Sequence, residues 1–346
     1  MTTPAEEETS NKINILPDEL MINIFRHLPL ETLFECEKVC TKWQTLARDV
    51  AVWRGFTIVL SGKSEDEADY ERIIGIIKTH GECIHRLKLQ YVSTYPMITA
   101  LIHLCPNLIS LELIMCRISK QFEDDVKKLP KLRKINLNNS LLMMGDLDVS
   151  INYDDLKYLH YLSLSNFGLP NQMRDGLLRC KNLRHIFIEK IKTLDIRYLQ
   201  NLIYSKLHIL HSLHIYGGDA INDDCMFMLS QCCSLKDLAI IRCENLTDEG
   251  LWRLTNLKTL EHLQLWNNVN FTEGILLKTL GSTNLIKLQS LSLSRVRNIS
   301  PLIVDLISEY YKKLKFLALY KCPRIINTDY EKQLKSKFRN IEIVLY

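Results

Sequence analysis

The chain has 346 residues and a mass of 40.4 kDa, with 47% hydrophobic and 24% charged residues, a balance that excludes a largely disordered protein. Its 44 lysines and arginines and 40 aspartates and glutamates give a formal net charge of +4. Because this charge is too even for a surface dedicated to nucleic acid, we expect no nucleic-acid partner.

The first twelve residues contain three consecutive glutamates and neither a basic cluster nor an apolar core. They fit no secretory signal or mitochondrial presequence, and we expect a disordered acidic terminus over residues 1–12. No uncharged apolar stretch approaches the roughly 20 residues of a membrane helix, so no membrane partner is expected. The 11 cysteines are spread along the chain, which favours reduced thiols and a cytoplasmic or nuclear location.

Residues 13–54 are predicted to form a small unit of three helices. The first helix opens at Pro17 and Asp18, ends near Pro29, and is expected to carry a single apolar stripe. The members of this stripe are Leu20, Ile24, Phe25 and Leu28. Two further amphipathic segments run over 31–40 and 42–47. A unit of this size has a small core and usually needs support from a partner or a neighbouring domain.

From residue 84 onward one pattern recurs: apolar, two residues, apolar, one residue, apolar. It is plain at Leu108, Leu111 and Leu113. The copies start at residues 84, 108, 132, 159, 183, 210, 235, 260, 288, 314 and 338, which are 24 to 28 residues apart. This spacing resembles the leucine-rich repeat, with an array over 84–346. Residues 55–83 are expected to hold a linker and a degenerate first copy, with Phe56 and Ile58 in its strand.

Each copy predicts a short strand whose alternate residues point into the core, followed by a return segment. Several return segments show apolar residues at helical spacing, namely 67–79, 196–206, 247–258 and 301–312. Strands on the inside and helices on the outside force a curved solenoid. The predicted fold is therefore α/β: three N-terminal helices followed by a right-handed horseshoe with parallel strands on its concave face.

Two further features of the sequence, the positions of its cysteines and the motif in residues 13–54, resemble known families. Cysteines lie three residues before or three residues after the strand core, at Cys105, Cys180, Cys232, Cys116, Cys243 and Cys322. This resembles the cysteine-containing class of leucine-rich repeats, whose best-known carriers are F-box proteins. Residues 13–54 closely resemble the F-box itself, whose motif positions are Leu16, Pro17, Glu19, Leu20, Ile24, Phe25, Leu28, Pro29, Val39, Cys40, Trp43 and Trp53.

The F-box resemblance implies docking to the small Skp-type adaptor of a cullin–RING ubiquitin ligase. It places at the docking surface Leu16, Pro17, Leu20, Ile24, Phe25 and Leu28. It assigns three further residues partly to the adaptor contact and partly to the core of the F-box itself: Val39, Trp43 and Leu46. The alternative is an apolar face that merely packs onto the first repeat.

A target protein is expected on the concave face, where exposed aromatic and basic residues gather in the second half of the array. The predicted binding residues are Phe187, Tyr216, Ile241, Arg242, Trp266, Arg295, Phe316 and Tyr320. The alternative is that these rings pack on one another as cross-strand pairs and bind nothing. The sequence does not identify the target.

Signals for catalysis or metal binding are weak. The sets His208, His211, His214 and His80, Cys83, His85 have metal-ligand spacing, but no paired Cys-x-x-Cys completes a tetrahedral site. Neither a glycine-rich phosphate loop nor a nucleophile elbow occurs. We therefore expect no cofactor, no metal and no catalytic residue. The leading hypothesis is a non-catalytic substrate receptor of a Skp–cullin–F-box ubiquitin ligase; the alternative is a repeat scaffold that acts without promoting ubiquitination.

Overall fold

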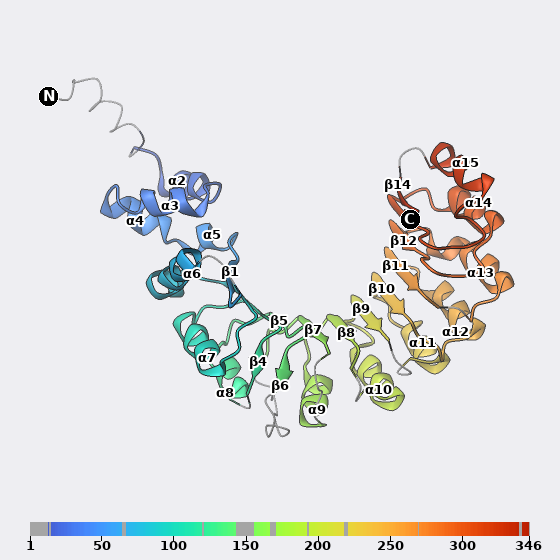
Figure 1. Ribbon diagram of the computed structural model, residues 1–346, viewed down its shortest axis with the longest axis horizontal. Coiled ribbons are helices and arrows are strands. Elements are labelled where there is room, and N and C mark those ends of the chain that lie inside the picture. Colours follow the sequence, from blue (N-terminus) through green and yellow to red (C-terminus); the bar gives the residue numbers. More distant parts are fainter. Residues whose placement is uncertain are drawn as a thin grey trace.

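The computed structural model describes residues 13, 15–63, 67–119, 121–142, 156–166, 171–191, 194–217, 221–268, 270–338 and 341–345. The acidic terminus predicted over 1–12 lies outside these residues. Figure 1 shows an open arc with a group of short helices at one end and strand β14 (Glu342–Val344) at the other. Strands line the inside of the arc and helices cover its outside, as the repeat pattern predicts.

The N-terminal group contains the three expected helices and a fourth, shorter one. Pro17 and Pro29 stand immediately before the first two helices, where a missing backbone N–H costs nothing. The Asp49 side chain accepts a hydrogen bond from the Ala51 backbone and thereby starts the fourth helix. The four are α2 (Asp18–Phe25), α3 (Leu30–Cys36), α4 (Thr41–Ala47) and α5 (Val50–Trp53).

The core of this helical group is completed by α6 (Glu67–His80), the first helix of the solenoid. The His80 imidazole stacks on the Trp53 ring, with centroids 5.2 Å apart and planes at 19°, and lies 5.1 Å from the Phe34 ring. Its Nε2 lies 3.0 and 3.1 Å from the two carboxylate oxygens of Glu37. Arg48 Nε donates to the same carboxylate at 2.9 Å. Because Glu37 and His80 are both buried, this contact fixes the helical group to the solenoid.

The solenoid is built on one parallel sheet of twelve strands whose spatial order follows the chain. Each of the eleven predicted copies supplies one strand, and equivalent leucines pair across neighbouring strands, as Leu111 does with Leu87 and Ile135. The strands are β1 (Ile58–Ser61), β2 (Arg86–Gln90), β3 (Ser110–Ile114), β5 (Lys134–Asn136), β7 (Tyr161–Ser165), β8 (His185–Glu189), β9 (Ser212–Tyr216), β10 (Asp237–Ile241), β11 (His262–Trp266), β12 (Ser290–Ser292), β13 (Phe316–Ala318) and β14. A separate pair, β4 (Arg117–Ile118) and β6 (Leu141–Leu142), lies beside the sheet.

The degenerate first copy forms β1, but Phe56 was placed wrongly in its strand. Ile58 and Leu60 are the buried alternate residues of β1. Phe56 precedes the strand and packs edge-on against Trp53, with ring centroids 6.0 Å apart. The bulky ring therefore belongs to the junction between the helical group and the sheet.

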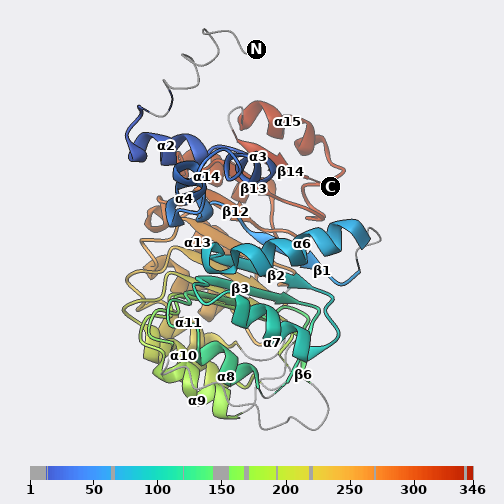
Figure 2. The same cartoon turned by 90° about the vertical axis from the view of Figure 1, so that its left-hand side faces the viewer.

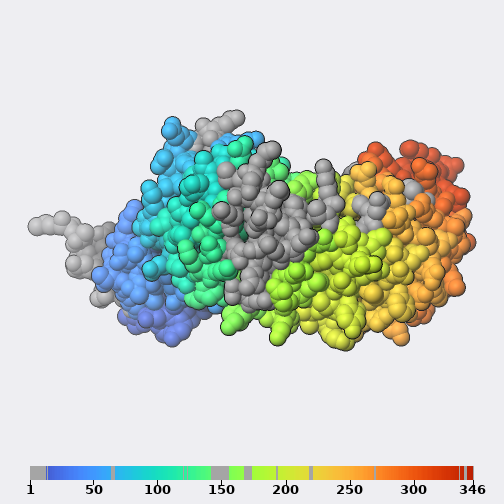
Figure 3. All heavy atoms as spheres, turned by 90° about the horizontal axis from the view of Figure 1, so that it is seen from below, coloured from blue at the N-terminus to red at the C-terminus, as the bar shows by residue number. Residues whose placement is uncertain are grey.

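Helices of uneven length return the chain along the convex side, which Figure 3 shows from below. The segment expected over 247–258 is divided into a short α-helix and a 3₁₀ turn. The convex elements after α6 are α7 (Tyr95–Leu104), α8 (Phe122–Lys127), α9 (Asn171–Arg179), α10 (Ile196–Lys206), α11 (Asp223–Leu229), α12 (Asp248–Trp252), η3 (Arg253–Asn256), α13 (Glu273–Leu280), α14 (Pro301–Tyr310) and α15 (Asp329–Lys337).

Side-chain hydrogen bonds tie successive convex helices together. Asp223 accepts hydrogen bonds from the backbone and the hydroxyl of Thr247 in the next unit, and Asp248 does the same for Thr272. The threonines also cap their own helices. A Cβ atom on Gly250 would lie 2.2 Å from Asp223 Oδ1, so a larger residue there would displace the Asp223 side chain from its hydrogen bonds to Thr247.

At the edge of the sheet where the strands end, a residue one to three positions after most strands adopts a left-handed backbone. Nine non-glycine residues there have φ between 51° and 57°: Tyr91, Met115, Asn139, Asn166, Lys190, Arg242, Asn267, Arg295 and Lys321. Their backbone N–H groups reach the next unit, as when Arg242 donates to the Trp266 carbonyl at 2.9 Å. The energetic cost of the left-handed backbone is offset by this hydrogen bond. We call the row of left-handed residues along this edge of the sheet the left-handed rim.

We predict that Glu37→Ala weakens the junction. The substitution removes the acceptor shared by His80 and Arg48, and the loss of such a buried acceptor typically costs about 1–3 kcal/mol of the free energy of unfolding. Urea unfolding of the full chain measures this loss. The matched control is Glu35→Ala, because Glu35 pairs with Lys38 on the surface and its removal should change stability by less than about 0.5 kcal/mol. Equal losses in the two variants would contradict the importance of this contact.

Candidate functional site

Six aliphatic side chains are exposed on the described part of the helical group; one of them, Val50 on α5, lies apart beside Arg54 and Arg133. Helix α2 turns Leu20 and Ile24 to the same side, where they are 49% and 42% exposed. Lys42 at the start of α4 lies 3.0 Å from Asp18, which brings the segment before α4 next to the start of α2. We call the other five exposed side chains the F-box patch; its members are Ile13, Ile15, Leu20, Ile24 and Val39.

The single stripe expected on the first helix is wrong at two positions: α2 ends at Phe25, so Leu28 lies beyond it, and Phe25 faces the core. Phe25 is 1% exposed and packs inward with Met21, its ring 5.2 Å from that of Trp43. Five residues separate Phe25 from Leu20, which places it about 140° further around the helix. Phe25 therefore belongs to the core and not to the free surface.

The other residues predicted for docking are distributed between surface and core. Pro17 is exposed, Leu46 is buried on the inner side of α4, and three are half-buried: Leu16, Leu28 and Trp43. Val39, expected to be shared between contact and core, is 59% exposed. The structure thus brings Pro17, Leu20, Ile24 and Val39 to the surface together with Ile13 and Ile15, which the motif does not single out.

On the concave face, a cluster of rings spans β7 to β9. The Phe187 ring lies 4.8 Å from the Tyr161 ring and 4.2 Å from the His214 ring, the latter edge-on. The His185 ring lies 6.4 Å from Tyr161. Tyr161 and His185 were missed because the expectation considered two outward positions per strand, whereas a five-residue strand presents three. The first outward position of each strand, which holds Tyr161 and His185, was the signal in the sequence that could have identified them.

A shallow hollow of about 230 Å³ lies beside this cluster. Three predicted binding residues line it: Phe187, Tyr216 and Ile241. Trp266 pairs with Ile241 in the next strand and is 38% exposed, so it extends the same apolar surface. The hollow and Trp266 together form what we call the concave site.

The remaining predicted residues lie apart from the concave site. Strand β12 presents serines outward, which separates Trp266 from Phe316 and Tyr320 on or after β13. Arg242 and Arg295 are exposed at the left-handed rim positions. Hydrogen bonding from Lys321, followed by that from Arg295, lowers the pKa of the Tyr320 hydroxyl. Tyr320 and its basic neighbours Lys321 and Arg295 thus form a second group of residues, near the C-terminal end of the array.

Charged side chains around the concave site have partners: Lys190 Nζ lies 3.3 Å from Glu189 Oε1, and His214 Nε2 lies 2.9 Å from Asp237 Oδ2. Glu189 accepts a hydrogen bond from Ser165 at 2.9 Å, and Lys190 lies 5.2 Å above the Tyr216 ring. Burial lowers the pKa of His185, which favours a neutral ring at pH 7. The concave site is therefore an apolar and aromatic surface with a polar border.

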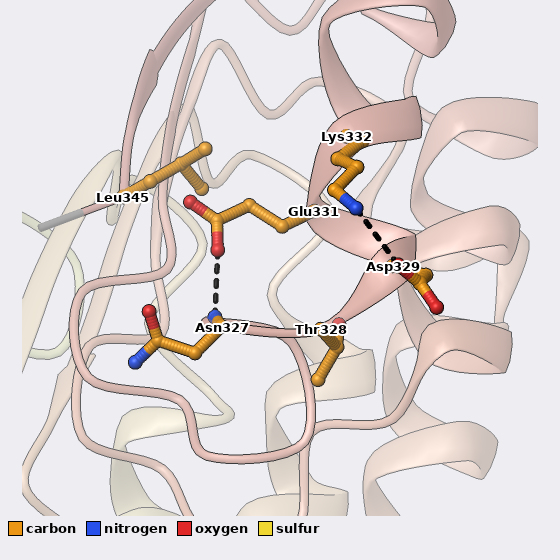
Figure 4. A pocket seen from close by; sticks show the side chains of 6 residues that line it. All are labelled: Asn327, Thr328, Asp329, Glu331, Lys332 and Leu345. Carbon is orange, nitrogen blue, oxygen red and sulfur yellow. Dashed lines mark hydrogen bonds and ion pairs between the residues drawn. The ribbon is translucent and has the colours of Figure 1, made fainter.

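A further hollow, of about 900 Å³, lies at the last unit between the start of α15 and Leu345 (Figure 4). Its side chains interact with one another: Glu331 accepts a hydrogen bond from the Asn327 backbone at 2.6 Å, and Lys332 donates to Asp329 at 2.9 Å. Because these groups are exposed and satisfied locally, we assign no site to this hollow.

Within the described residues, no three His, Cys, Asp or Glu side chains are arranged to hold a metal ion. In the same part of the chain, no helix is long and apolar enough to cross a membrane. All 11 cysteines are free thiols. Burial raises the pKa of Cys105, Cys232 and Cys243 to about 12, which keeps these thiols protonated and suits packing, not chemistry.

We predict that thiol reactivity follows burial. In the folded chain at about pH 8, iodoacetamide should label Cys40 and Cys233, which are exposed, well before Cys105, Cys232 and Cys243, which are buried and protonated. Mass spectrometry of a time course measures the order, and labelling in denaturant serves as the control. Early labelling of Cys243 in the folded chain would contradict its assignment to the core.

Comparison with known families identifies the type of domain that the N-terminal group forms. Residues 13–58 match the F-box-like domain family. The chain is similar to F-box protein SKIP19 of Arabidopsis thaliana, with 25% identity over 258 residues that cover 64% of this chain and 82% of that protein. It is also similar to putative F-box/LRR-repeat protein 22 of the same plant, with 26% identity over 220 residues that cover 53% and 71%. F-box/LRR-repeat protein 5 of Xenopus laevis is 36% identical over 59 residues, which are 17% of this chain and 9% of that protein.

Two solved structures are similar to most of the chain. A chain from the yeast complex of Rad7 and Elc1 covers 99% of this chain and is itself covered to 98%, at 13% identity and a TM-score of 0.49. An internalin from Listeria monocytogenes gives 91% and 93% coverage, 14% identity and a TM-score of 0.44. With an F-box-like domain at its N-terminus and a parallel repeat solenoid after it, the chain resembles F-box/leucine-rich-repeat proteins.

Proposed function

We propose that this protein is the substrate-recognition subunit of a Skp–cullin–F-box ubiquitin ligase. The F-box patch docks to a Skp-type adaptor, through which the chain joins a cullin and a RING subunit. The concave face of the arc binds a target protein. The observation that carries the proposal is the F-box patch itself: five exposed aliphatic side chains on an F-box-like domain, next to a core that is already filled by Met21 and Phe25.

The patch is suited to a protein partner. A cluster of exposed aliphatic side chains is unfavourable in water, and burying it in an interface removes that cost. Figure 2 shows α2 and α3 at the end of the molecule, beyond α6. An adaptor on the F-box patch therefore leaves the concave face accessible.

The arc provides the surface for a target. Twelve strands at a spacing of about 4.8 Å make an inner sheet about 50 Å long, which can accept a folded domain or an extended segment. The aromatic side chains of the concave site bury large areas with few rotatable bonds, which is typical of binding hot spots.

In this mechanism the chain performs no bond-making step. It holds the target near a ubiquitin-charged conjugating enzyme and so raises the effective concentration of a target lysine. The buried contact between Glu37 and His80 serves this role because it sets the direction of the arc relative to the adaptor. Free and largely buried thiols agree with a reducing compartment, and we place the protein in the cytoplasm or the nucleus.

We predict that Leu20→Asp combined with Ile24→Asp abolishes adaptor binding while the chain stays folded. Both side chains are exposed, so the new carboxylates cost little in the free chain but would be buried without partners in the complex. Pull-down with a recombinant Skp-type adaptor and circular dichroism measure the two effects. Phe25 is unsuitable for this purpose, because a charge there would disrupt the core.

The matched control for this variant is Phe227→Asp on the convex helix α11, since Phe227 is also 49% exposed. It should keep full adaptor binding. Retained adaptor binding by the Leu20 and Ile24 double variant would overturn the docking surface. Adaptor binding without any ubiquitin transfer to captured proteins in a reconstituted reaction would favour the scaffold alternative.

We predict that Trp266→Ala loses target proteins but keeps the adaptor. Truncation of an aromatic hot-spot residue typically costs 2 kcal/mol or more, roughly a thirtyfold loss of affinity. Quantitative mass spectrometry of proteins captured while the ligase is blocked measures the loss. The control is Val59→Ala, an exposed apolar truncation on β1 at the other end of the sheet. If the two variants capture the same proteins equally, the target site lies elsewhere.

A further inference from the structure

The hollow of the concave site lies where the outward side chains change from small to large. Strand β7 presents Ser163 and Ser165, and its neighbour β8 places Phe187 and Glu189 opposite them. On the far side of Glu189, β9 supplies the Tyr216 ring. The rings stand beside a strip of serines, and the step between them forms the hollow of about 230 Å³. Because pockets for small molecules typically measure about 300–1,000 Å³, this hollow is suited to one side chain of a partner.

The hollow offers a fixed carboxylate. Glu189 carries the one carboxylate among its lining residues, which include neither a lysine nor an arginine. The Ser165 hydroxyl donates to a Glu189 carboxylate oxygen at 2.9 Å, and the Ser163 hydroxyl donates to the Asn138 side-chain oxygen at the same distance. Ser165 is 1% exposed, so its hydrogen bond holds the carboxylate in place before a partner arrives. This order lowers the entropy cost of binding.

Aromatic rings adjoin the carboxylate. Phe187 lies two positions before Glu189 and therefore on the same face of β8, and Tyr216 is the partner of Glu189 on β9. The Phe187 ring is held by its neighbours, 4.8 Å from the Tyr161 ring and 4.2 Å from the His214 ring. A cation gains energy both from a carboxylate and from the face of a ring. A carboxylate bordered by rings is therefore suited to a positively charged side chain.

Lys190 already shows this chemistry within the protein. Its Nζ lies 3.3 Å from Glu189 Oε1 and 5.2 Å above the Tyr216 ring. The Lys190 side chain is 50% exposed and belongs to the left-handed rim, outside the lining of the hollow. An exposed ion pair of this kind contributes little free energy, so a cation of a partner can replace the ammonium group at low cost. Lys190 then turns into solvent.

The arrangement favours arginine as the incoming side chain. A guanidinium is planar, stacks on aromatic faces and donates two parallel hydrogen bonds to a carboxylate. Glu189 and the neighbouring rings offer both kinds of contact in one hollow. The ammonium group of a lysine would make only the contacts that Lys190 already makes, and it would gain nothing by replacing them.

The apolar part of the concave site determines what lies next to this arginine. Beyond Tyr216, the same outward row continues with Ile241 on β10 and Trp266 on β11. Trp266 is three strands from Glu189, about 14 Å at a strand spacing of about 4.8 Å, which an extended segment covers in about four residues. A target segment that crosses the strands would therefore place an apolar side chain about four residues from its arginine.

We propose that the hollow beside Glu189 binds an arginine side chain of a target protein, while an apolar side chain of the same segment packs on Ile241 and Trp266. As an account of target choice, this assignment rests on the proposed ligase function. As a binding site, it can be tested on the free chain. Glu189 recognises the charge of the target, and Trp266 supplies apolar contact area.

Isothermal titration calorimetry of the full chain at low ionic strength tests the proposal. The probe is a glycine- and serine-rich peptide with a central arginine and a leucine about four residues to either side, which serves both directions of the segment. Two comparison peptides carry lysine or citrulline in place of the arginine; citrulline keeps the shape and removes the charge. We expect the arginine peptide to bind most tightly, about tenfold more tightly than the citrulline peptide.

Two substitutions in the protein should act in opposite directions. Glu189→Gln keeps the shape but removes the charge, and it should weaken binding of the arginine peptide about tenfold. Lys190→Gln removes the competing ammonium group and should tighten binding about threefold. The matched control is Glu261→Gln, because Glu261 also pairs with a lysine, its Oε1 2.8 Å from Lys236 Nζ, but lies outside the hollow. The control should bind the peptide as the unaltered chain does.

Absence of binding, equal binding of the arginine and citrulline peptides, or unchanged binding in Glu189→Gln would overturn the site. Equal or tighter binding of the lysine peptide would overturn arginine as its ligand, and weaker binding after Lys190→Gln would overturn the competition. Adaptor pull-down separates this proposal from the ligase function, because Glu189→Gln should still bind the adaptor. Selective binding of the arginine peptide without adaptor binding would leave the hollow standing and remove the ligase role.

Discussion

The arrangement of this protein depends on one buried contact, the packing of His80 between Trp53 and the Glu37 carboxylate. The F-box helices are short and their core is small, so they need the first solenoid helix to exclude water. The same contact determines which side of the F-box stays exposed. Since α6 and β1 cover the side near Phe34 and Trp53, the outer side with Leu20 and Ile24 remains free, and the direction of the arc relative to that side is fixed.

The repeats extend from this anchored end and form the binding surface. Equivalent leucines pair from strand to strand, so each outward side chain is placed next to its counterparts in neighbouring copies. The binding character of the arc then follows from what the sequence places at these positions: rings on β7 to β9, serines on β12. The two edges differ as well. One carries left-handed residues such as Arg242, and the other carries Arg133 and Arg184, immediately before β5 and β8.

Much of the fold could be predicted from the sequence, because the same leucine spacing recurs in every repeat and each repeat forms the same local structure. The spacing of leucines located the eleven strands of the predicted copies, and the F-box motif located the first three helices of the N-terminal group. The orientation of Phe25 could not be read from the motif, because it depends on how Met21 and Trp43 fill a core made of several helices. The ring cluster required three outward positions per strand to be considered. The hollow beside Arg54 is lined by residues of three later copies, so no local pattern indicates it.

The central claim is that the F-box domain is anchored through α6 and presents its other side to an adaptor. Hydrogen–deuterium exchange of the full chain, alone and with a Skp-type adaptor, tests this claim most directly. The account predicts slower exchange over residues 16–24 and 39–43 in the complex, with no change in α6 or in the strands of the concave face. Slower exchange in α6 or in the strands, with residues 16–24 unaffected, would contradict it.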